Sequence, residues 1–352
     1  MPSDRANGAA ATRNSADAAN TPDSAGLGAP TRRWSARSIA ITIVQNHLIW
    51  PLLGVLVLIG FFIPGFMSTR NLTNVVWGST PLACMTMGMF LVMVTGALDL
   101  SIESTFAVAP TLGILVITQW LPGAHWTLAL VTLIAVGVAV GLVNGMISVK
   151  LGVNAFLVTL ATMLILRGVV VYLIPEGVYS LPTGFTFWGG DRVLGIPVAI
   201  IVIILLTALF AVVMNSTPFG KSIYAIGNNE PAAFVAGINV QRVMIGAFGL
   251  AGVLAALGGL LQVGRLDSAT ATMGDGEIMM VFAAATLGGT SLTGGRGHVT
   301  GILGAALVIT GIDNMMNLLG VEPSIRRIIF GVILLAAICL ASLQEKASRA
   351  NL

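Results

Sequence analysis

The sequence predicts an all-α membrane protein that crosses the bilayer about ten times and contains broken or re-entrant helices. Two observations indicate this fold class. Hydrophobic residues make up 56% of the 352 residues and charged residues only 9%, against roughly a quarter in soluble proteins. The apolar residues also gather in runs close to the roughly 20 residues that a spanning helix needs. Too little polar surface remains for a soluble enzyme, so that class is excluded.

The apolar runs predict a transmembrane domain at residues 38–345. Residues 1–37 lack an apolar run and are expected to form a disordered cytoplasmic tail, and residues 346–352 form a second cytoplasmic tail. The expected spans are 48–64, 73–95, 101–120, 126–148, 153–174, 196–214, 243–263, 278–291, 299–318 and 325–343. The eighth is short and interrupted by glycine, so we expect a half-helix or re-entrant segment there.

An even number of spans places both termini on one side of the membrane. Most Lys and Arg residues fall on that side, which the positive-inside rule assigns to the cytoplasm. The basic residues are dispersed between apolar runs, so the net charge of +3 does not indicate a nucleic-acid surface. Cys84 and Cys339 lie within apolar runs and have no Cys or His neighbours at metal-ligand spacing, so no metal site is expected.

Glycines at spacings of four predict close helix packing. Gly137, Gly141 and Gly145 form such a row in the fourth span, and Gly297 with Gly301 forms another at the start of the ninth. Small residues let helix backbones approach each other, which is the main source of helix association in a membrane. We therefore expect these glycines to pack helices together and not to bind a ligand.

A carboxylate interrupts the apolar pattern in GALDLS at residues 96–101. Asp99 follows a long uncharged run, and an unpartnered carboxylate at membrane depth costs at least about 2.5 kcal/mol. Asp99 or Ser101 could cap the helix that starts after Ser101. The alternative is that both residues line a substrate pathway, because broken helices are tolerated beside a cavity. The sequence leaves both interpretations open.

The loop at residues 216–243 is expected in the cytoplasm and contains a short helix. Asn229 or Glu230 can cap this helix, Pro231 suits its first turn, and Gly237 suits its end. Such a helix on the cytoplasmic face would offer a docking site for another subunit, and the alternative is an ordinary connecting loop.

A glycine-rich run precedes the ninth span. It lacks the GxxxxGK[ST] spacing of a phosphate-binding loop, so we predict a tight structural turn between two half-spans. The residues assigned to this turn are Gly288, Gly289, Gly294, Gly295, Arg296 and Gly297.

Polar residues in the fifth and ninth spans are candidates for a substrate pathway. The candidates are Asn154, Phe156, Thr159, Thr162 and Asn314, together with Asp313 and Asn317 on either side of Asn314. Phe156, Thr159 and Thr162 share one helical face, as residues that line a pathway for a polar solute would. The alternative for the threonines is hydrogen bonding between helices. Arg167 could reach the interface or pair with a carboxylate.

Five segments, in order, resemble the permease subunits of bacterial ABC sugar importers, the group that carries ribose, xylose, arabinose and galactose. The segments are GALDLS at 96–101, NAFLVTLATMLILRG at 154–168, FGKSIYAIGNNEPAAFVAGINV at 219–240, GGTSLTGGRG at 288–297 and IDNMMNLLGV at 312–321. The resemblance covers about residues 48–343. The chain departs from it in GALDLS, where many relatives have GGIDLS, and in NNEPAA, where the family usually has NPEAA or NEEAA.

The resemblance implies a type II-like importer permease in the bacterial inner membrane, acting as a pore-forming subunit for a monosaccharide and not as an enzyme. It implies a second permease subunit, either an identical copy or a related chain, and cytoplasmic ABC ATPase subunits that bind ATP and Mg²⁺. It also implies a periplasmic or lipoprotein sugar-binding protein, surrounding membrane lipid, and no cofactor on this chain. The outer segments 175–197 and 265–277 are expected to contact the binding protein. The implied ATPase-coupling residues are Gly220, Lys221, Asn229, Glu230, Ala232, Ala233 and Gly237.

Three other functions remain as alternatives. A permease for branched-chain amino acids or nucleosides would share this design. A secondary transporter driven by protons would use the membrane carboxylates. An intramembrane enzyme would use Asp99, Glu103 or Asp313 as acid or base, but the clustered motifs of such enzymes are missing from the sequence.

Overall fold

The computed structural model describes residues 49–350, with side chains described for residues 49–339. The expected disordered tail at residues 1–37 lies outside the described residues, as do residues 351–352 of the expected C-terminal tail. Within the described part the chain is almost entirely helical, and its strands are four two-residue segments. The prediction of an all-α protein is therefore confirmed.

Each expected span corresponds to a helix. These helices are α2 (Ile49–Gly60), α3 (Thr69–Val94), α4 (Ile102–Leu115) with the π-helix η1 (Val116–Trp120), α5 (Trp126–Lys150), α6 (Ala155–Leu173), α8 (Val198–Ser216), α11 (Val240–Leu266), α12 (Glu277–Leu287), α13 (Val299–Leu318) and α14 (Pro323–Ala350). Among the described residues, seven helices are long and apolar enough to cross a membrane, while α2 and α12 are shorter. The chain is thus a polytopic membrane protein, and α12 has the length of a half-helix.

Shorter elements connect the spans. They are the helices α7 (Thr183–Gly190), α9 (Pro218–Asn228) and α10 (Glu230–Val235) and two small sheets. Strand β1 (Val178–Tyr179) pairs antiparallel with β4 (Ser268–Ala269), and β2 (Arg192–Val193) pairs antiparallel with β3 (Ile196–Pro197). The expected outer segment 175–197 is therefore an ordered structure that is tied to the end of α11.

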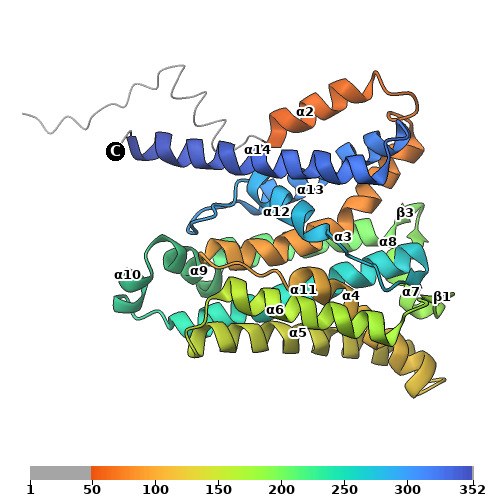
Figure 1. Ribbon diagram of the computed structural model, residues 1–352, viewed down its shortest axis with the longest axis horizontal. Coiled ribbons are helices and arrows are strands. Elements are labelled where there is room, and N and C mark those ends of the chain that lie inside the picture. Colours follow the sequence, from red (N-terminus) through yellow and green to blue (C-terminus); the bar gives the residue numbers. More distant parts are fainter. Residues whose placement is uncertain (1–48, 351–352) are drawn as a thin grey trace, which may run out of the picture.

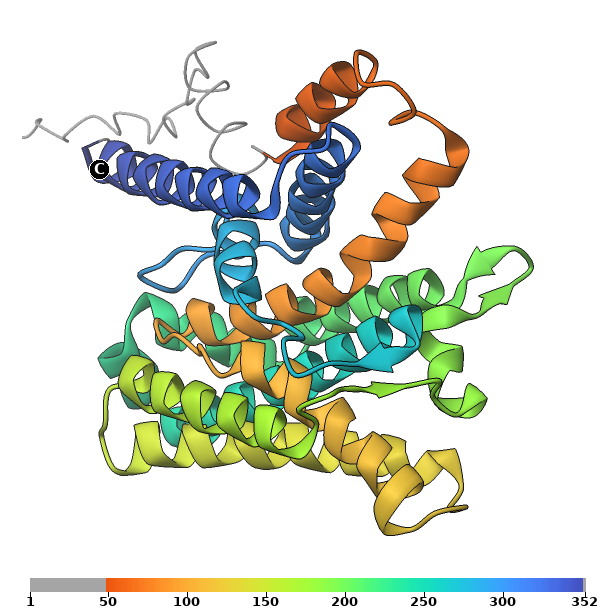
Figure 2. The same ribbon diagram turned by 45° about the vertical axis from the view of Figure 1, so that its right-hand side comes forward.

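Most of the long helices run along one direction (Figure 1). Helices α5 and α6 form one side of the bundle, α3, α4, α8 and α11 lie in the middle, and α2, α12, α13 and α14 form the other side, as the turned view in Figure 2 also shows. Helices α9 and α10 lie at one end together with the end of α14, and we call this the α10 end. Helix α7 and both sheets lie at the other end, which we call the α7 end.

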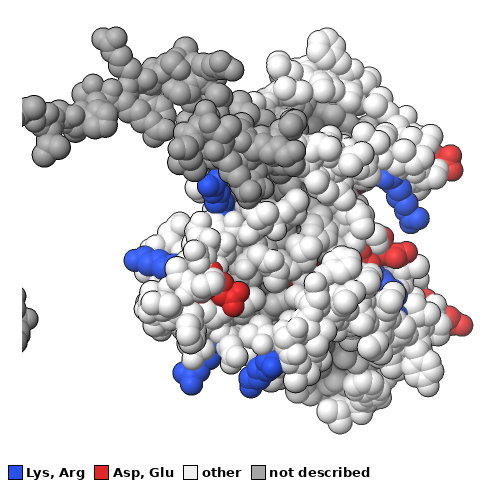
Figure 3. Space-filling model, turned by 60° about the vertical axis from the view of Figure 1, so that its left-hand side comes forward, with Lys and Arg blue, Asp and Glu red and all other residues white. Residues whose placement is uncertain are grey.

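The outer surface of the bundle is apolar. Large hydrophobic side chains point outward along the spans, as with Leu164, Leu205 and Val332, which are 63%, 65% and 61% exposed. The face drawn in Figure 3 carries few charged side chains, and broad uncharged surfaces lie between them. An apolar belt of this kind is what a lipid bilayer requires of the helices that contact it.

Helix α11 is the centre of the packing, because it lies against α3, α4, α5 and α7. The predicted glycine row on α5 makes one of these contacts. A Cβ atom on Gly137 would lie 2.5 Å from the carbonyl oxygen of Gly252, and one on Gly141 would overlap the carbonyl oxygen of Phe248. The row therefore packs α5 against α11 backbone to backbone, as expected.

The second predicted glycine row is wrong. Helix α13 begins at Val299, so Gly297 precedes the helix and cannot form a row with Gly301 on it. Gly297 has a φ of 158°, and a Cβ there would lie 2.5 Å from the ring of Phe90. Gly301 packs instead against the carbonyl of Gly288. Both glycines still allow close packing, but each against a different element.

Candidate functional site

The α10 end carries two consecutive helices in the loop at residues 216–243. Asn229 caps α10, because its Oδ1 accepts a hydrogen bond from the backbone N–H of Ala232 at 3.0 Å. Gly237 follows the helix with a φ of 85°, in the left-handed region that favours glycine. The expected short helix is confirmed, and its cap is Asn229, with Glu230 as the first helical residue.

Helix α9 was not predicted from the sequence. Its signal is nevertheless present, because Thr217 accepts a hydrogen bond from the N–H of Gly220 at 3.2 Å and Pro218 occupies the first helical position. Ile223 and Ile226 form the buried face of α9. Of the other coupling residues implied by the resemblance, Lys221 is exposed.

The tip of α10 is apolar and exposed. Phe234 and Val235 are 72% and 86% exposed, while Ala233 is 5% exposed and packs with Ile226 and Val240. A groove of about 1040 Å³ lies between α10 and the adjoining ends of α5, α6 and α11. Exposed apolar side chains outside the membrane-spanning helices are typical of a protein-docking surface.

Helix α9 is wedged against the interior of the bundle at Gly227. A Cβ atom on Gly227 would overlap both the carbonyl oxygen of Val94, at the end of α3, and the backbone nitrogen of Gly295. These two backbone atoms are themselves joined, because the N–H of Gly295 donates to the Val94 carbonyl at 2.8 Å. Three segments therefore meet here with no room for a side chain.

Two side chains of α9 extend this contact. The Tyr224 hydroxyl donates to the carbonyl of Gly297 at 2.9 Å, and the Asn228 amide donates to the carbonyl of Gly295 at 3.1 Å. Burial raises the pKa of the Tyr224 phenol above its ordinary value, so the hydroxyl keeps its proton as a donor. Helix α9 is therefore hydrogen-bonded to the segment that connects α12 and α13.

That segment is the predicted glycine-rich turn, which we define as residues 288–298. The N–H of Ser291 donates to the carbonyl of Arg296 at 3.0 Å and closes the turn. Gly289, Gly294 and Gly295 have φ values of 88°, 88° and 74°, which explains why glycine is needed there. Arg296 is exposed. The turn has the tight irregular form that the sequence predicts, and it also contacts α9. The expectation of two half-spans is wrong, because the turn joins the short α12 to the full-length span α13.

The segment between α3 and α4 brings predicted pathway residues together. Asp99 is 1% exposed, and its Oδ1 accepts hydrogen bonds from the N–H of Ser101 at 2.9 Å and from its hydroxyl at 2.6 Å. Asn144 on α5, which the sequence analysis missed, donates to the Ser101 hydroxyl at 2.8 Å. The Thr162 hydroxyl donates to Asn144 at 2.6 Å. One buried polar chain thus joins α4, α5 and α6.

The remaining candidates on α6 separate into two groups. Thr159 is buried and accepts a hydrogen bond from the N–H of Leu100 at 3.1 Å. Thr159 and Thr162 therefore both make hydrogen bonds to other segments, as the alternative to a pathway role expects. Asn154 caps α6 by accepting from the N–H of Phe156 at 2.9 Å. Phe156 is 43% exposed on the outer surface and lies apart from the buried chain. A pathway role for these residues stays a prediction.

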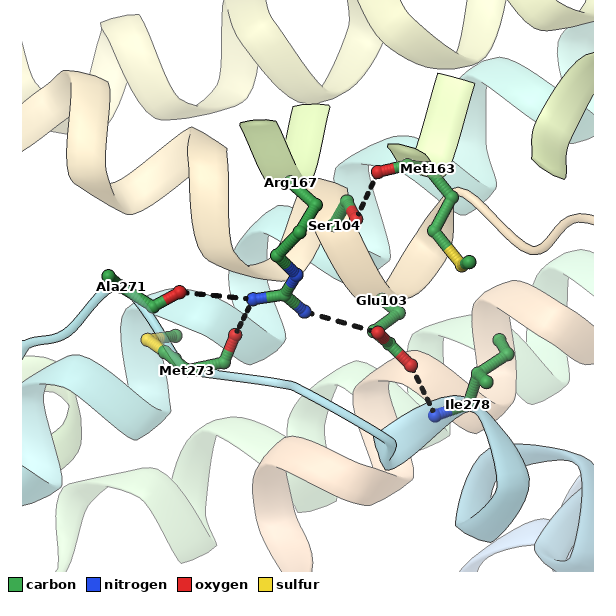
Figure 4. A network of polar contacts seen from close by, with 7 residues as sticks. All are labelled: Glu103, Ser104, Met163, Arg167, Ala271, Met273 and Ile278. Carbon is green, nitrogen blue, oxygen red and sulfur yellow. Dashed lines mark hydrogen bonds and ion pairs between the residues drawn. The ribbon is translucent and has the colours of Figure 1, made fainter. Parts of the chain in front are cut away.

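Helix α4 begins in the interior of the bundle and not at its end. Glu103 forms an ion pair with Arg167 at 3.1 Å, and Ser104 donates to the carbonyl of Met163 at 2.7 Å (Figure 4). Met163 and Arg167 belong to the middle part of α6, so α4 starts beside the middle of α6. The carboxylate that the sequence predicted as one partner for Arg167 is therefore Glu103.

The same ion pair fixes the start of α12. The second carboxylate oxygen of Glu103 accepts a hydrogen bond from the N–H of Ile278 at 3.0 Å, at the positive end of α12 (Figure 4). Arg167 donates to the carbonyls of Ala271 at 3.3 Å and Met273 at 2.8 Å. The chain after α11 therefore turns back into the bundle before α12 begins, as expected of a re-entrant segment.

Asn314 lies elsewhere, toward the α7 end. Its side-chain amide exchanges hydrogen bonds with that of Asn71 at 2.8 and 3.1 Å, which joins α13 to α3. Asn314 also lines a cavity of about 440 Å³ between α3, α11, α12 and α13. The neighbouring Asp313 pairs with Arg326 at 3.3 Å. The predicted pathway residues thus do not form one site: one group belongs to the buried polar chain, Asn314 and its neighbours lie toward the α7 end, and Asn154 and Phe156 are exposed at the start of α6.

Comparison with known proteins supports the assignment of the fold. Residues 71–338 match the family described as the permease component of branched-chain amino acid transport systems. The chain belongs to this permease family. Its members are transport components, so the chain is a multi-pass permease subunit of a bacterial inner-membrane transport system.

Several relatives of this permease are named as sugar permeases. The ribose import permease protein of Escherichia coli K12 is 36% identical over 303 residues, which cover 84% of this chain and 92% of that protein. The ribose import permease protein of Bacillus subtilis 168 is 36% identical, covering 82% and 91%. The L-arabinose transport system permease protein of Escherichia coli K12 is 33% identical, covering 86% and 93%. No solved structure matches the chain.

Proposed function

We propose that this permease forms the membrane pathway for a monosaccharide in an ATP-driven importer. Its relatives at 33 to 36% identity include permeases named for ribose and arabinose, which favours a pentose-sized sugar over a branched-chain amino acid or a nucleoside. The chain itself carries out no chemistry and binds no cofactor. ATP and Mg²⁺ are bound by partner ATPase subunits, and a periplasmic sugar-binding protein delivers the substrate.

The contact of α9 with the bundle interior supports this function most directly. The exposed tip of α10 is a docking site for an ATPase subunit, and α9 is joined to α10 at Asn229. Through Gly227, α9 bears on the end of α3 and on the glycine-rich turn. Movement of the ATPase subunit is therefore transmitted to the segment between α3 and α4 and to the glycine-rich turn between α12 and α13. A second copy of the chain completes the pathway.

The orientation follows from this assignment. The α10 end faces the cytoplasm, where the ATPase subunits work, and both termini are cytoplasmic. The α7 end faces the periplasm and receives the binding protein on the segments 175–197 and 265–277. The permease then opens alternately to the periplasm and to the cytoplasm, and this alternation moves the sugar. Weak contacts along the pathway allow the sugar to be released.

The docking role of α10 predicts a specific loss of coupling. Phe234→Asp is expected to weaken binding of the ATPase subunit at least about tenfold, because apolar anchors contribute most to such interfaces. Glu230→Lys and Gly237→Val are expected to lower coupling as well, the second because valine strains the left-handed backbone at residue 237. Co-purification of the ATPase subunit and ATP-dependent sugar uptake measure these effects.

The matched control is Leu194→Asp, which introduces the same charge at a 97% exposed residue of the α7 end. It is expected to leave co-purification of the ATPase subunit unchanged. Membrane abundance should stay normal in every variant, since residues 194, 230, 234 and 237 are all exposed. Normal ATPase binding and normal uptake by Phe234→Asp would refute the docking role of α10.

A further inference from the structure

The cavity near the α7 end has a lining unlike that of the bundle around it. It occupies about 440 Å³, within the roughly 300 to 1,000 Å³ of small-molecule sites. Polar side chains from four helices line it. The polar residues that matter here are Asn74, Gln262, Arg265, Glu277, Asp313 and Asn317.

Four of these side chains are free to bind a ligand. Asn74, Gln262, Glu277 and Asn317 line the cavity, and within residues 49–339 their side chains make no hydrogen bond to the protein. Glu277 is the first residue of α12, but the N–H of Ile278 at that helix end is already taken by Glu103 at 3.0 Å. The carboxylate of Glu277 is therefore left facing the cavity.

Arg265 contributes a positive group beside them. Its guanidinium lies over the ring of Trp77, 5.8 Å from the ring centroid, and Trp77 is fixed because its indole N–H donates to the carbonyl of Gly189 at 2.8 Å. No carboxylate within the described part of the chain forms an ion pair with Arg265. Its N–H groups are thus held at the wall of the cavity by the indole.

The lining holds charged groups of both signs. Arg265 is positive, and the negative Asp313 is already paired with Arg326 at 3.3 Å. Such a site has no strong preference for a free ion. It offers instead both donors and acceptors at short range, which suits hydroxyl groups because each hydroxyl can donate and accept. The chemistry fits a small neutral polyol.

We propose that this cavity, which we call the outer cavity, is a binding station for the sugar on its way through the permease, with Glu277, Gln262, Asn74, Asn317 and Arg265 as hydroxyl partners. This inference rests on the proposed function and adds to it the residues that recognise the substrate. The station lies near the α7 end, because its residues Arg265 and Asn317 belong to the last turns of α11 and α13. It is therefore placed to receive the sugar after the binding protein releases it. It binds weakly, because the sugar must leave again.

The test uses the complete importer, with ATPase subunits and binding protein, in proteoliposomes containing the permease variants Gln262→Met and Asn317→Leu. The probes are labelled D-ribose and L-arabinose with saturating amounts of loaded binding protein. We expect the number of sugar molecules moved per ATP hydrolysed to fall at least about fivefold, with ATP hydrolysis within twofold of wild type. The thermal midpoint of each variant should match the wild type.

Asn215→Leu is the control, since Asn215 is exposed near the end of α8 and lines neither cavity. It should transport like the wild type. Wild-type ratios of sugar to ATP in both cavity variants would overturn the station and leave the proposed function intact. Failure of the wild-type importer to move either sugar with ATP would instead refute the proposed function.

A second measurement covers the case in which a cavity variant does not fold. In a Cys84→Ala, Cys339→Ala background, Gln262→Cys should react with a membrane-impermeant maleimide added from the outside. Sugar-loaded binding protein should slow this reaction at least about threefold in the complete importer, whereas binding protein without sugar should not. Equal rates under the two conditions would also overturn the station.

Discussion

Gly227→Ala is expected to lower ATP-dependent uptake at least about tenfold. The added Cβ would overlap the Val94 carbonyl and the Gly295 nitrogen, and both are backbone atoms joined by a hydrogen bond of 2.8 Å. Helix α9 must then move away, which breaks the hydrogen bonds of Tyr224 and Asn228 to the glycine-rich turn. Two lost hydrogen bonds cost roughly 1 to 3 kcal/mol. Uptake and ATP hydrolysis in proteoliposomes measure the effect.

Gly168→Ala is the matched control. Gly168 lies within α6, and a Cβ there meets nothing within 4 Å. Alanine in a helix is more favourable than glycine by roughly 0.5 to 1 kcal/mol, so this variant should be slightly more stable and transport normally. The two substitutions are chemically identical and opposite in expected sign. Uptake by Gly227→Ala equal to that of Gly168→Ala would show that α9 does not transmit movement through this contact.

The second large effect concerns the ion pair at the start of α4. Arg167→Met is expected to destabilise the permease by about 3 to 5 kcal/mol, because it leaves the Glu103 carboxylate buried without a counter-charge. Glu103 would keep only its hydrogen bond from Ile278. The thermal midpoint of the detergent-solubilised protein and its abundance in the membrane report the loss.

The double variant Arg167→Met, Glu103→Gln separates charge from packing. It should recover much of the lost stability, because no buried charge remains. Arg326→Met provides a comparison on a more exposed pair, in which the Asp313 side chain is 37% exposed, and we expect an effect of about 1 kcal/mol or less. Equal losses in Arg167→Met and Arg326→Met, or no recovery in the double variant, would contradict the role assigned to this ion pair.

The sequence predicts the helices of this fold well because their signals are local. Apolar length indicates the spans, the short run at residues 278–291 indicates the half-helix α12, and Asn229 with Gly237 indicates the ends of α10. The glycine row around Gly141 has the spacing of a helix face, so its packing role is also visible in the sequence.

The contacts that assemble the site are not local, and the sequence does not reveal them. Asn144 was missed because it lies within an apolar span and its partners Ser101 and Thr162 belong to other helices. The contact of Tyr224 with Gly297 joins residues 73 positions apart. Helix α9 does have a local signal in the capping residue Thr217, but its glycines and its position between two spans are equally typical of a loop.

Contacts between distant parts of the chain also explain why the predicted pathway residues are separated. Asp99, Ser101, Thr159 and Thr162 come together because α4 begins in the middle of the bundle, which depends on Glu103 and Arg167. Asn154 and Phe156 precede that level on α6 and remain on the outside. Asn314 belongs to the outer cavity, whose lining residues Gln262 and Glu277 carry no recognisable spacing in the sequence.

We infer that the permease is a conduit for sugar that changes conformation only when partner subunits drive it. The most direct measurement compares sugar accumulation in liposomes containing the permease alone with that in liposomes containing the permease, its ATPase subunits and the binding protein. We predict accumulation against a gradient only in the complete system with ATP. Accumulation by the permease alone, driven by a proton gradient, or chemical conversion of the sugar by the permease alone, would contradict the claim.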